Sequence, residues 1–192
     1  VGPDNDERIE LLVRAGVDVI VVDTAHGHSQ GVLDRVKWVK KNYSHVQVIG
    51  GNIATGEAAK ALVAHGADGV KVGIGPGKAC TTRLQTGFHV PMFTAVKECS
   101  RVGGVPIIAD GGIRNSGDMI KAFAAGADAV MVGSMFAGTE EAPGLIISNI
   151  NNEKVKMFRG MASIAAQMDS SGKVSVDSEG KIGWVFYPEE AK

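Results

Sequence analysis

A cysteine in a glycine-rich loop is the residue of this sequence best suited to covalent chemistry. Cys80, one of only two cysteines, lies in the stretch KVGIGPGKACTTR at residues 71–83, which we expect to be an irregular loop after an apolar strand. A thiol in such a loop is accessible, and its thiolate is a nucleophile. The alternative for Cys80 is a small residue packed inertly under the loop. Cys99 instead falls near the apolar face of a predicted helix and is interpreted as a core residue.

Glycine turns at three places along the chain suggest a site for a charged ligand. Gly75 and Gly77 can turn backbone amides toward an anion or carbonyls toward a cation, because glycine lets the chain approach closely. The turns DGG at 110–112 and GS at 133–134 also follow apolar strands. Loops after the last strands of a barrel commonly hold a phosphate. For Asp110, and likewise for Asn52 after an earlier strand, capping of a helix or turn is the alternative.

Five short apolar runs alternate with helical patterns along the chain. The runs are rich in β-branched residues and nearly continuous, which is typical of strands buried on both faces of a parallel sheet. They lie at residues 17–23, 46–52, 69–73, 106–112 and 129–134. The alternation predicts an α/β fold, either doubly wound or closed as a barrel. Polar residues at the strand ends favour the barrel, whose chemistry collects at that rim.

Five strands are too few to close an eight-stranded barrel. We therefore interpret residues 1–192 as part of a single larger (β/α)8 domain. Within it, residues 138–158 break the rhythm and predict a protruding hairpin, and the polar, glycine-containing residues 164–183 predict a flap.

Charge and composition exclude several classes of partner. Lysine and arginine number 20 against 21 acidic residues, so there is no electrostatic reason to expect nucleic acid or a membrane surface as partner. No apolar run reaches the length of a membrane span and the first residues are not a signal peptide, which favours the cytoplasm. The two cysteines have no metal-ligand spacing and are expected to be reduced thiols.

Six motifs, taken together, resemble the IMP dehydrogenase and GMP reductase family, in the family's order and over essentially the whole chain. They are DTAHGHS (23–29), GGN (50–52), VGIGPGKACTTR (72–83), IADGGIRNSGD (108–118), VMVGSMFAGTEEAPG (130–144) and RGMAS (159–163). The resemblance implies the C-terminal part of a catalytic barrel, covering about its last five β/α units. It also implies a homotetramer whose small-molecule partner is a purine mononucleotide, namely GMP, IMP or XMP.

The resemblance gives the loop cysteine a chemical role. It implies that Cys80 attacks the purine at C2, with the Thr82 hydroxyl beside the leaving group or the attacking water. The adduct then exchanges hydride with the nicotinamide of NAD or NADP. By the same resemblance, Asp23 and Asn52 border the nicotinamide ribose and the reacting centre.

The remaining site residues also follow from the resemblance. The implied substrate contacts are Lys78, Asp110, Gly112, Gly133, Ser134, Met161, Ala162 and Glu179. The implied potassium ligands are the backbone carbonyls of Gly75, Gly77 and Cys80.

The direction of the reaction depends on where the chain departs from the family. The flap of the dehydrogenases carries an Arg-Tyr pair that activates water, and residues 168–180 here contain neither residue type. Ile164 occupies the place where many reductases have a glutamate. Loss of a water-activating base is costly for a dehydrogenase, so the reading favours GMP reductase, with IMP dehydrogenase as the first alternative. A non-catalytic nucleotide-binding barrel and a phosphate-binding barrel lyase or isomerase are the others.

Overall fold

The computed structural model describes residues 1–161, 163–164, 166, 168 and 182–186 of the chain. These residues form two compact units. The first comprises residues 1–74, 90–110 and 119–131, and the second comprises residues 75–89, 111–118 and the described residues from 132 onward. Each unit is described by itself below.

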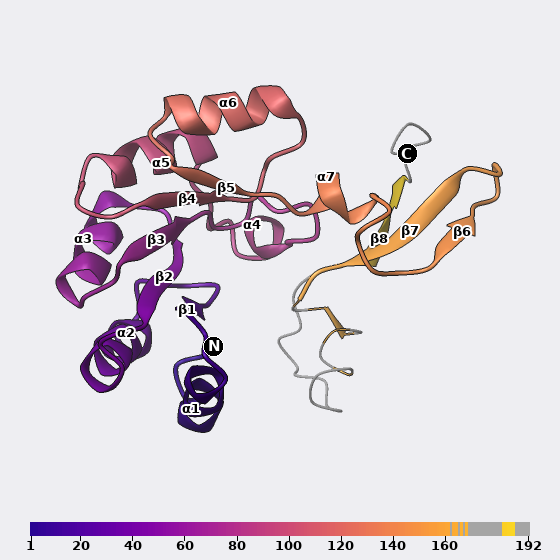
Figure 1. Cartoon of the computed structure of the whole chain (residues 1–192). Helices are drawn as coiled ribbons and strands as arrows, with labels where there is room; N and C mark the ends of the chain where they lie inside the picture. Colours follow the sequence, from indigo (N-terminus) through magenta and orange to yellow (C-terminus); the bar gives the residue numbers. More distant parts are fainter. Residues whose placement is uncertain (162, 165, 167, 169–181, 187–192) are drawn as a thin grey trace. The chain divides into compact units, whose positions relative to one another are not determined.

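The first unit is built on the parallel sheet that the sequence predicts (Figure 1). Its five strands lie side by side in sequence order, and every pair of neighbours is parallel. The strands are β1 (Val19–Asp23), β2 (Gln47–Ile53), β3 (Gly69–Val72), β4 (Ile107–Asp110) and β5 (Ala129–Met131). The last two are shorter than predicted, because glycine turns with positive φ follow β4 and a short helix follows β5.

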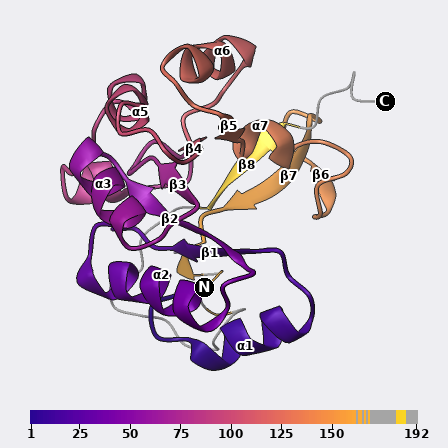
Figure 2. The same cartoon turned by 60° about the vertical axis from the view of Figure 1, so that its left-hand side comes forward.

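Helices connect the strands and cover the outer side of the curved sheet (Figures 1 and 2). They are α1 (Asp6–Arg14), α2 (Gln30–Asn42), α3 (Gly56–Ala64), α5 (Met92–Ser100) and α6 (Ser116–Ala124). Local sequence explains two of their starts: the Asn5 side chain accepts from the Arg8 amide, and the Thr55 side chain accepts from the Ala58 amide. None of the helices in the described part of the chain has the length and apolar character needed to span a membrane.

The core lies between the sheet and these helices. Ile20, Val22, Val48 and Val70 are part of it and are at most 2 % exposed. In β1 the residues that alternate with Ile20 and Val22 are partly buried or exposed, and β5 is largely exposed. Of the five strands, only β3 is buried at every position, so the prediction of burial on both faces is wrong for the others. In β1 and β4 buried residues alternate with less buried ones, because the helices cover one face of the sheet.

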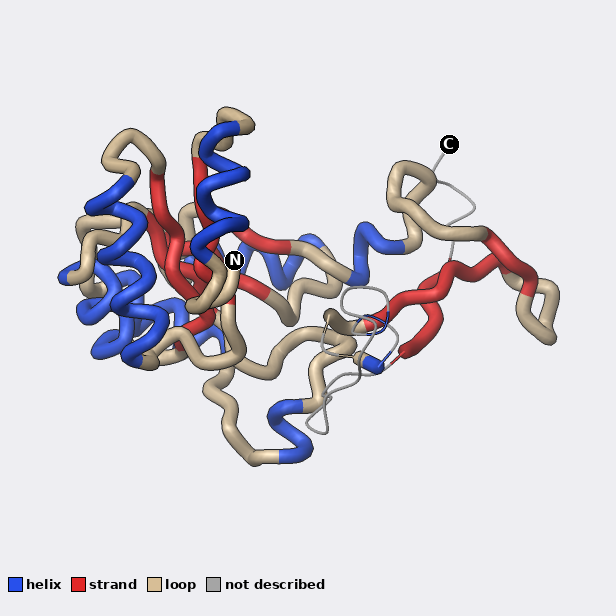
Figure 3. Tube along the Cα trace, turned by 90° about the horizontal axis from the view of Figure 1, so that it is seen from below, coloured by secondary structure: helices blue, strands red, loops and turns tan. Residues whose placement is uncertain are grey.

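The second unit holds the remaining elements (Figure 3). It contains the short helices α4 (Thr82–Gln85) and α7 (Ser134–Ala137) and the strands β6 (Ile146–Ser148), β7 (Lys154–Arg159) and β8 (Ile182–Phe186). An antiparallel pair, β6 with β7, lies within residues 138–159, and β8 adds an antiparallel neighbour to β7 that the sequence did not predict. The insertion of residues 138–158 into a barrel as a hairpin remains a prediction. Most of the predicted flap at 164–183 lies outside the described residues.

A buried lysine holds the segment before the β6–β7 hairpin. Lys156 in β7 is 2 % exposed, and its ammonium donates to the carbonyl oxygens of Thr139 and Ala142 at 2.6 and 2.7 Å. A buried ammonium is tolerated only when its donors are satisfied. Lys156 therefore ties the loop at 139–142 to the β-sheet of this unit.

Candidate active site

Four polar side chains meet at the carboxyl ends of the first unit's strands, and we call them the strand-end cluster. Its members are Asp23 in β1, Asn52 in β2, Lys71 in β3 and Asp110 in β4. The Lys71 ammonium lies 2.5 Å from Oδ2 of Asp110 and 3.4 Å from Oδ1 of Asp23. The sequence predicts three of these residues as site residues, and the structure brings all three together.

Strand register explains how one lysine reaches two carboxylates. Asp23 is opposite Gly51 in the β1–β2 pairing, and Gly51 is opposite Lys71 in the β2–β3 pairing. Asp23 and Lys71 are therefore two strands apart, with a residue that has no side chain between them. A Cβ on Gly51 would lie 2.8 Å from the Lys71 Cβ and 2.7 Å from its carbonyl oxygen. The glycine thus leaves the space that the lysine side chain uses.

Asn52 connects the cluster to the end of β3. Its Nδ2 donates to the Gly73 carbonyl at 2.7 Å and to Asp110 Oδ2 at 2.9 Å. Because both partners are acceptors, the amide orientation is determined by the network. Its Oδ1 is buried and accepts from none of the residues that the structure describes. Gly73 has a φ of +144°, and a Cβ there would collide with the Asp110 carbonyl oxygen, so only glycine fits.

The strand-end cluster offers hydrogen-bond acceptors to a ligand. Asp110 receives both of its side-chain bonds, from Lys71 and Asn52, on Oδ2, and its side chain is 22 % exposed. Oδ1 of Asp110 makes no hydrogen bond to a described residue, and so remains able to accept one. Together with Oδ1 of Asn52, this arrangement suits a ligand that offers hydroxyl or amide N–H donors.

Lys71 is not among the site residues that the sequence predicts. The residue stands at the start of the stretch that contains Cys80, and its side chain is 3 % exposed. The available signal was a charged residue inside a strand that otherwise reads as apolar and buried, because such a residue is almost always paired.

The second unit contains the loop with the predicted nucleophile, residues 75–89, which we call the thiol loop. Cys80 is partly buried, and its thiol lies 3.3 Å from the Thr82 hydroxyl oxygen. The Cys80 amide donates to the Gly77 carbonyl at 3.1 Å, and helix α4 begins at Thr82. The expectation that residues 71–83 lack regular structure is therefore wrong where α4 starts, whereas residues 71 and 72 lie in β3, within the strand predicted at 69–73.

Loops of the second unit pack on the thiol loop. A Cβ on Gly111 would lie 2.9 Å from Pro76 Cγ and 3.2 Å from the Gly77 amide nitrogen, and Gly111 and Gly112 both have positive φ. The turn that includes Gly112 therefore lies against the loop that carries Cys80.

The other predicted substrate contacts have varied settings. Lys78 is exposed on the thiol loop, Gly133 is the N-cap residue of α7 and Ser134 is its first residue. Met161 is 87 % exposed. Ala162 and Glu179 lie outside the described residues.

The second cysteine has the opposite environment. Cys99 in α5 is fully buried, which confirms the prediction of a core residue. Burial, and secondarily the charge of Glu98, raises the pKa of the Cys99 thiol to about 12. Cys99 is therefore an unreactive thiol at neutral pH.

The donor chemistry of the thiol loop fits an alkali cation. The carbonyls of Gly75, Gly77 and Cys80 fall within six residues, and oxygen is the ligand type that hard cations take. Gly75 has a φ of +83°, and a Cβ there would lie 3.2 Å from Arg83 Cβ. Among the described residues, no group of three or more histidine, cysteine or carboxylate side chains is arranged to hold a metal ion.

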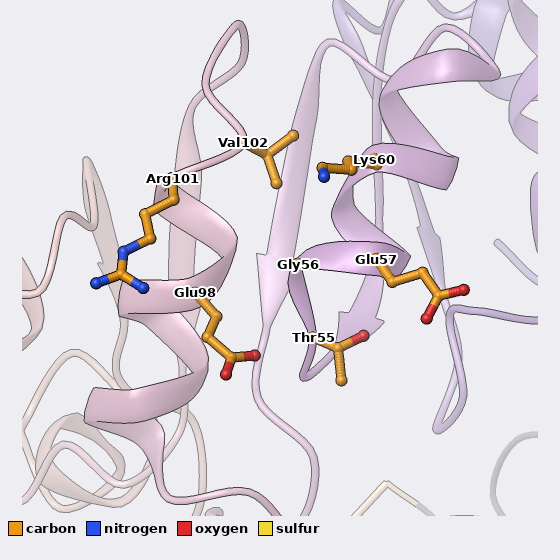
Figure 4. A pocket seen from close by; sticks show the side chains of 7 residues that line it. All are labelled: Thr55, Gly56, Glu57, Lys60, Glu98, Arg101 and Val102. Carbon is orange, nitrogen blue, oxygen red and sulfur yellow. The ribbon is translucent and has the colours of Figure 1, made fainter.

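An open cavity of about 490 Å³ lies in the first unit between α3 and α5 (Figure 4). Glu57, Lys60, Glu98 and Arg101 line it and are all exposed. Figure 4 shows Arg101 and Glu57 pointing away from each other. None of the predicted site residues lines this cavity, and its charged groups do not converge, so it is not the candidate site.

Comparison with known proteins points to one family. A family model described as the IMP dehydrogenase / GMP reductase domain matches residues 1–185. The chain is 54 % identical over 173 residues to an inosine-5'-monophosphate dehydrogenase of Pasteurella multocida, covering 88 % of this chain and 35 % of the relative. It is 50 % identical over 192 residues to the enzyme of the same name from Staphylococcus aureus, covering 98 % of this chain and 39 % of the relative.

A solved structure matches nearly the whole chain. It is a cysteine-to-alanine variant of GMP reductase from Trypanosoma brucei in complex with guanosine 5'-monophosphate, at 47 % identity and a TM-score of 0.92. The match covers 98 % of this chain and 41 % of that one, so the chain spans less than half the length of these relatives. The parallel five-stranded α/β sheet is accordingly part of a (β/α)8 barrel fold.

Proposed function

The chain belongs to the IMP dehydrogenase / GMP reductase family, and on this premise we propose that the full-length protein is an oxidoreductase acting at purine C2 through a covalent adduct with Cys80. The observation that carries the proposal is the pairing of a partly buried thiol with a hydroxyl 3.3 Å away in a glycine-rich loop. A thiolate adds to the electron-poor C2 carbon, and the leaving group departs from the resulting tetrahedral centre. We assign to the Thr82 hydroxyl, 3.3 Å from the Cys80 thiol, the transfer of a proton to or from that group.

The strand-end cluster supplies recognition. Asp110 accepts hydrogen bonds from the ribose hydroxyls of the nucleotide, for which its Oδ1 is available. Asp23 and Asn52 border the reacting centre and the nicotinamide ribose. NAD or NADP, when bound, supplies or receives the hydride. The buried Oδ1 of Asn52 is an acceptor that a ligand donor can satisfy.

The loops of the second unit supply the contacts to phosphate and base. Positive charge on Lys78 and the backbone amides at Gly112, Gly133 and Ser134 suit a phosphate. Met161, Ala162 and Glu179 are proposed to contact the purine, and the carbonyls of Gly75, Gly77 and Cys80 to hold potassium. Assembly as a homotetramer stays a prediction.

We favour GMP reduction, in which the C2 amino group leaves as ammonia, C2 receives hydride, and the C2–S bond then breaks to release IMP and the Cys80 thiolate. Reduction needs no activated water, and residues 168–180 contain no arginine or tyrosine that could activate one. IMP dehydrogenation is the second candidate, because relatives that are 50 % to 54 % identical carry that name. In that reaction the C2 hydride would pass to NAD, and hydrolysis of the remaining adduct would release XMP and free the Cys80 thiol.

Two measurements on the full-length protein test the proposal. Absorbance at 340 nm with GMP plus NADPH, and separately with IMP plus NAD, gives the direction. Mass spectrometry after incubation with 6-chloropurine ribotide should find a mass gain on the peptide with Cys80, which Cys80→Ala abolishes and Cys99→Ala retains. Nucleotide binding without a mass gain at Cys80 would instead support a non-catalytic nucleotide-binding barrel.

A further inference from the structure

We propose that Lys71 is a positioning residue that, together with Asn52, holds the Asp110 carboxylate in the orientation that receives the nucleotide's ribose hydroxyls. The inference rests on the proposed function for the identity of the ligand. It goes beyond that function by giving a role to a residue outside the predicted site.

The burial of Lys71 requires an explanation other than stability. Its side chain is 3 % exposed, in a strand whose other residues are apolar and fully buried. Taking an ammonium and a carboxylate out of water costs about as much as their attraction returns, so a well-packed apolar residue is often as stabilising in such a place. A lysine here is better explained by what its charge positions.

The hydrogen bonds of Lys71 and Asn52 show that the positioned group is the Asp110 carboxylate. Lys71 and Asn52 both donate to Oδ2 of Asp110, from two different strands. Two donors on one oxygen fix the rotation of a carboxylate, whose last side-chain torsion is otherwise broad. The other oxygen, Oδ1, is then presented for a ligand on a side chain that is 22 % exposed. Because the Asp110 carboxylate is already oriented, less conformational entropy is lost when a ligand hydroxyl binds to it.

Asp23 is a second carboxylate that the Lys71 ammonium neutralises. Its carboxylate lies 3.4 Å from the same ammonium, and its side chain is 56 % exposed. Without Lys71, the strand ends would carry two carboxylates with no cation among the cluster's own members. Like charges would then push the Asp110 carboxylate away from its present position.

The principal test compares Lys71→Met with Lys40→Met. Lys40 makes a more exposed ion pair in the same unit, 2.9 Å from Asp68 Oδ2 just before β3 begins, and it belongs to no proposed site. We expect Lys71→Met to raise the nucleotide Kd and KM about tenfold or more, the scale of a hydrogen bond to a charged group. The KM for the nicotinamide cofactor and kcat should change by smaller factors, and Lys40→Met should leave all three constants unchanged.

A second variant perturbs the lysine without removing its charge. Lys71→Arg keeps the positive charge but replaces the compact ammonium by a planar guanidinium, which changes the position of the donors relative to Asp110, so it should raise nucleotide KM in the same direction. It keeps the inference testable if Lys71→Met fails to fold. A nucleotide Kd within twofold of the wild type in a folded Lys71→Met protein overturns the proposal. So does an equal weakening of nucleotide and cofactor, which indicates a general structural role.

The measurements separate this inference from the proposed function. Nucleotide Kd is measured by equilibrium binding, without turnover, and tests Lys71 directly. Adduct formation at Cys80 with 6-chloropurine ribotide tests the chemistry. If wild-type protein binds GMP but forms no adduct, the proposed function fails while the comparison of Lys71→Met with Lys40→Met still decides the role of Lys71.

Discussion

Iodoacetamide should alkylate Cys80 and spare Cys99 in the folded protein. The Cys80 thiol is partly exposed on the thiol loop, whereas the Cys99 side chain is fully buried within α5. The reagent must reach the sulfur and must find it as thiolate, because the thiolate is the reactive form. Cys99 fails both requirements, and this makes alkylation a stringent test of the two environments.

The magnitude follows from the raised pKa. With a pKa of about 12, only about one Cys99 thiol in ten thousand is ionised at pH 8. An ordinary exposed cysteine with a pKa of about 8.5 is about one quarter ionised at that pH. Ionisation alone therefore slows alkylation of Cys99 more than about a thousandfold relative to an ordinary exposed thiol, before its burial is counted.

The assay is a time course of alkylation at pH 8, quenched with excess thiol and read by peptide mass spectrometry. Cys80→Ala should remain unlabelled until urea unfolds it, after which Cys99 reacts. Saturating nucleotide should slow labelling of Cys80 in the wild type. Alkylation of Cys99 in folded protein at a rate within tenfold of Cys80 would refute the reasoning.

Three further predictions follow from single residues. The raised pKa of Cys99 stabilises the folded protein fully below pH 9, and this stabilisation is lost as the pH rises toward 12. The free energy of unfolding in urea should therefore fall by about 1.4 kcal/mol per pH unit over this range, and Cys99→Ala should lack that fall. Lys78→Ala should raise nucleotide KM about tenfold while kcat changes little, since a phosphate contact is equally present before and during the chemical step. Gly73→Ala should lower the free energy of unfolding in urea by about 1 to 3 kcal/mol, and by more than Gly87→Ala, whose φ of +71° is also positive but whose Cβ would meet nothing within 4 Å.

Local patterns predicted the sheet well. Each apolar run of the sequence overlaps one strand of the sheet, with β2 ending one residue beyond its run, and the order of the five strands follows the chain. Hydrophobic periodicity and glycine stops are properties of a few neighbouring residues, so they can be recognised without knowing the fold. The ends of β4 and β5 were less predictable, because glycine turns and a short helix after them compete with the strand pattern.

What the sequence by itself determined is therefore the α/β architecture, the family, and the types of residue at the strand ends, including Asp23, Asn52 and Asp110. Only the tertiary structure decided that Lys71 joins two of those carboxylates and that Gly51 leaves room for it. The physical reason is that these contacts join residues 39 and 48 positions apart in the chain. Such contacts are created by strand register, and a buried charge is stable only when register brings its partners within reach.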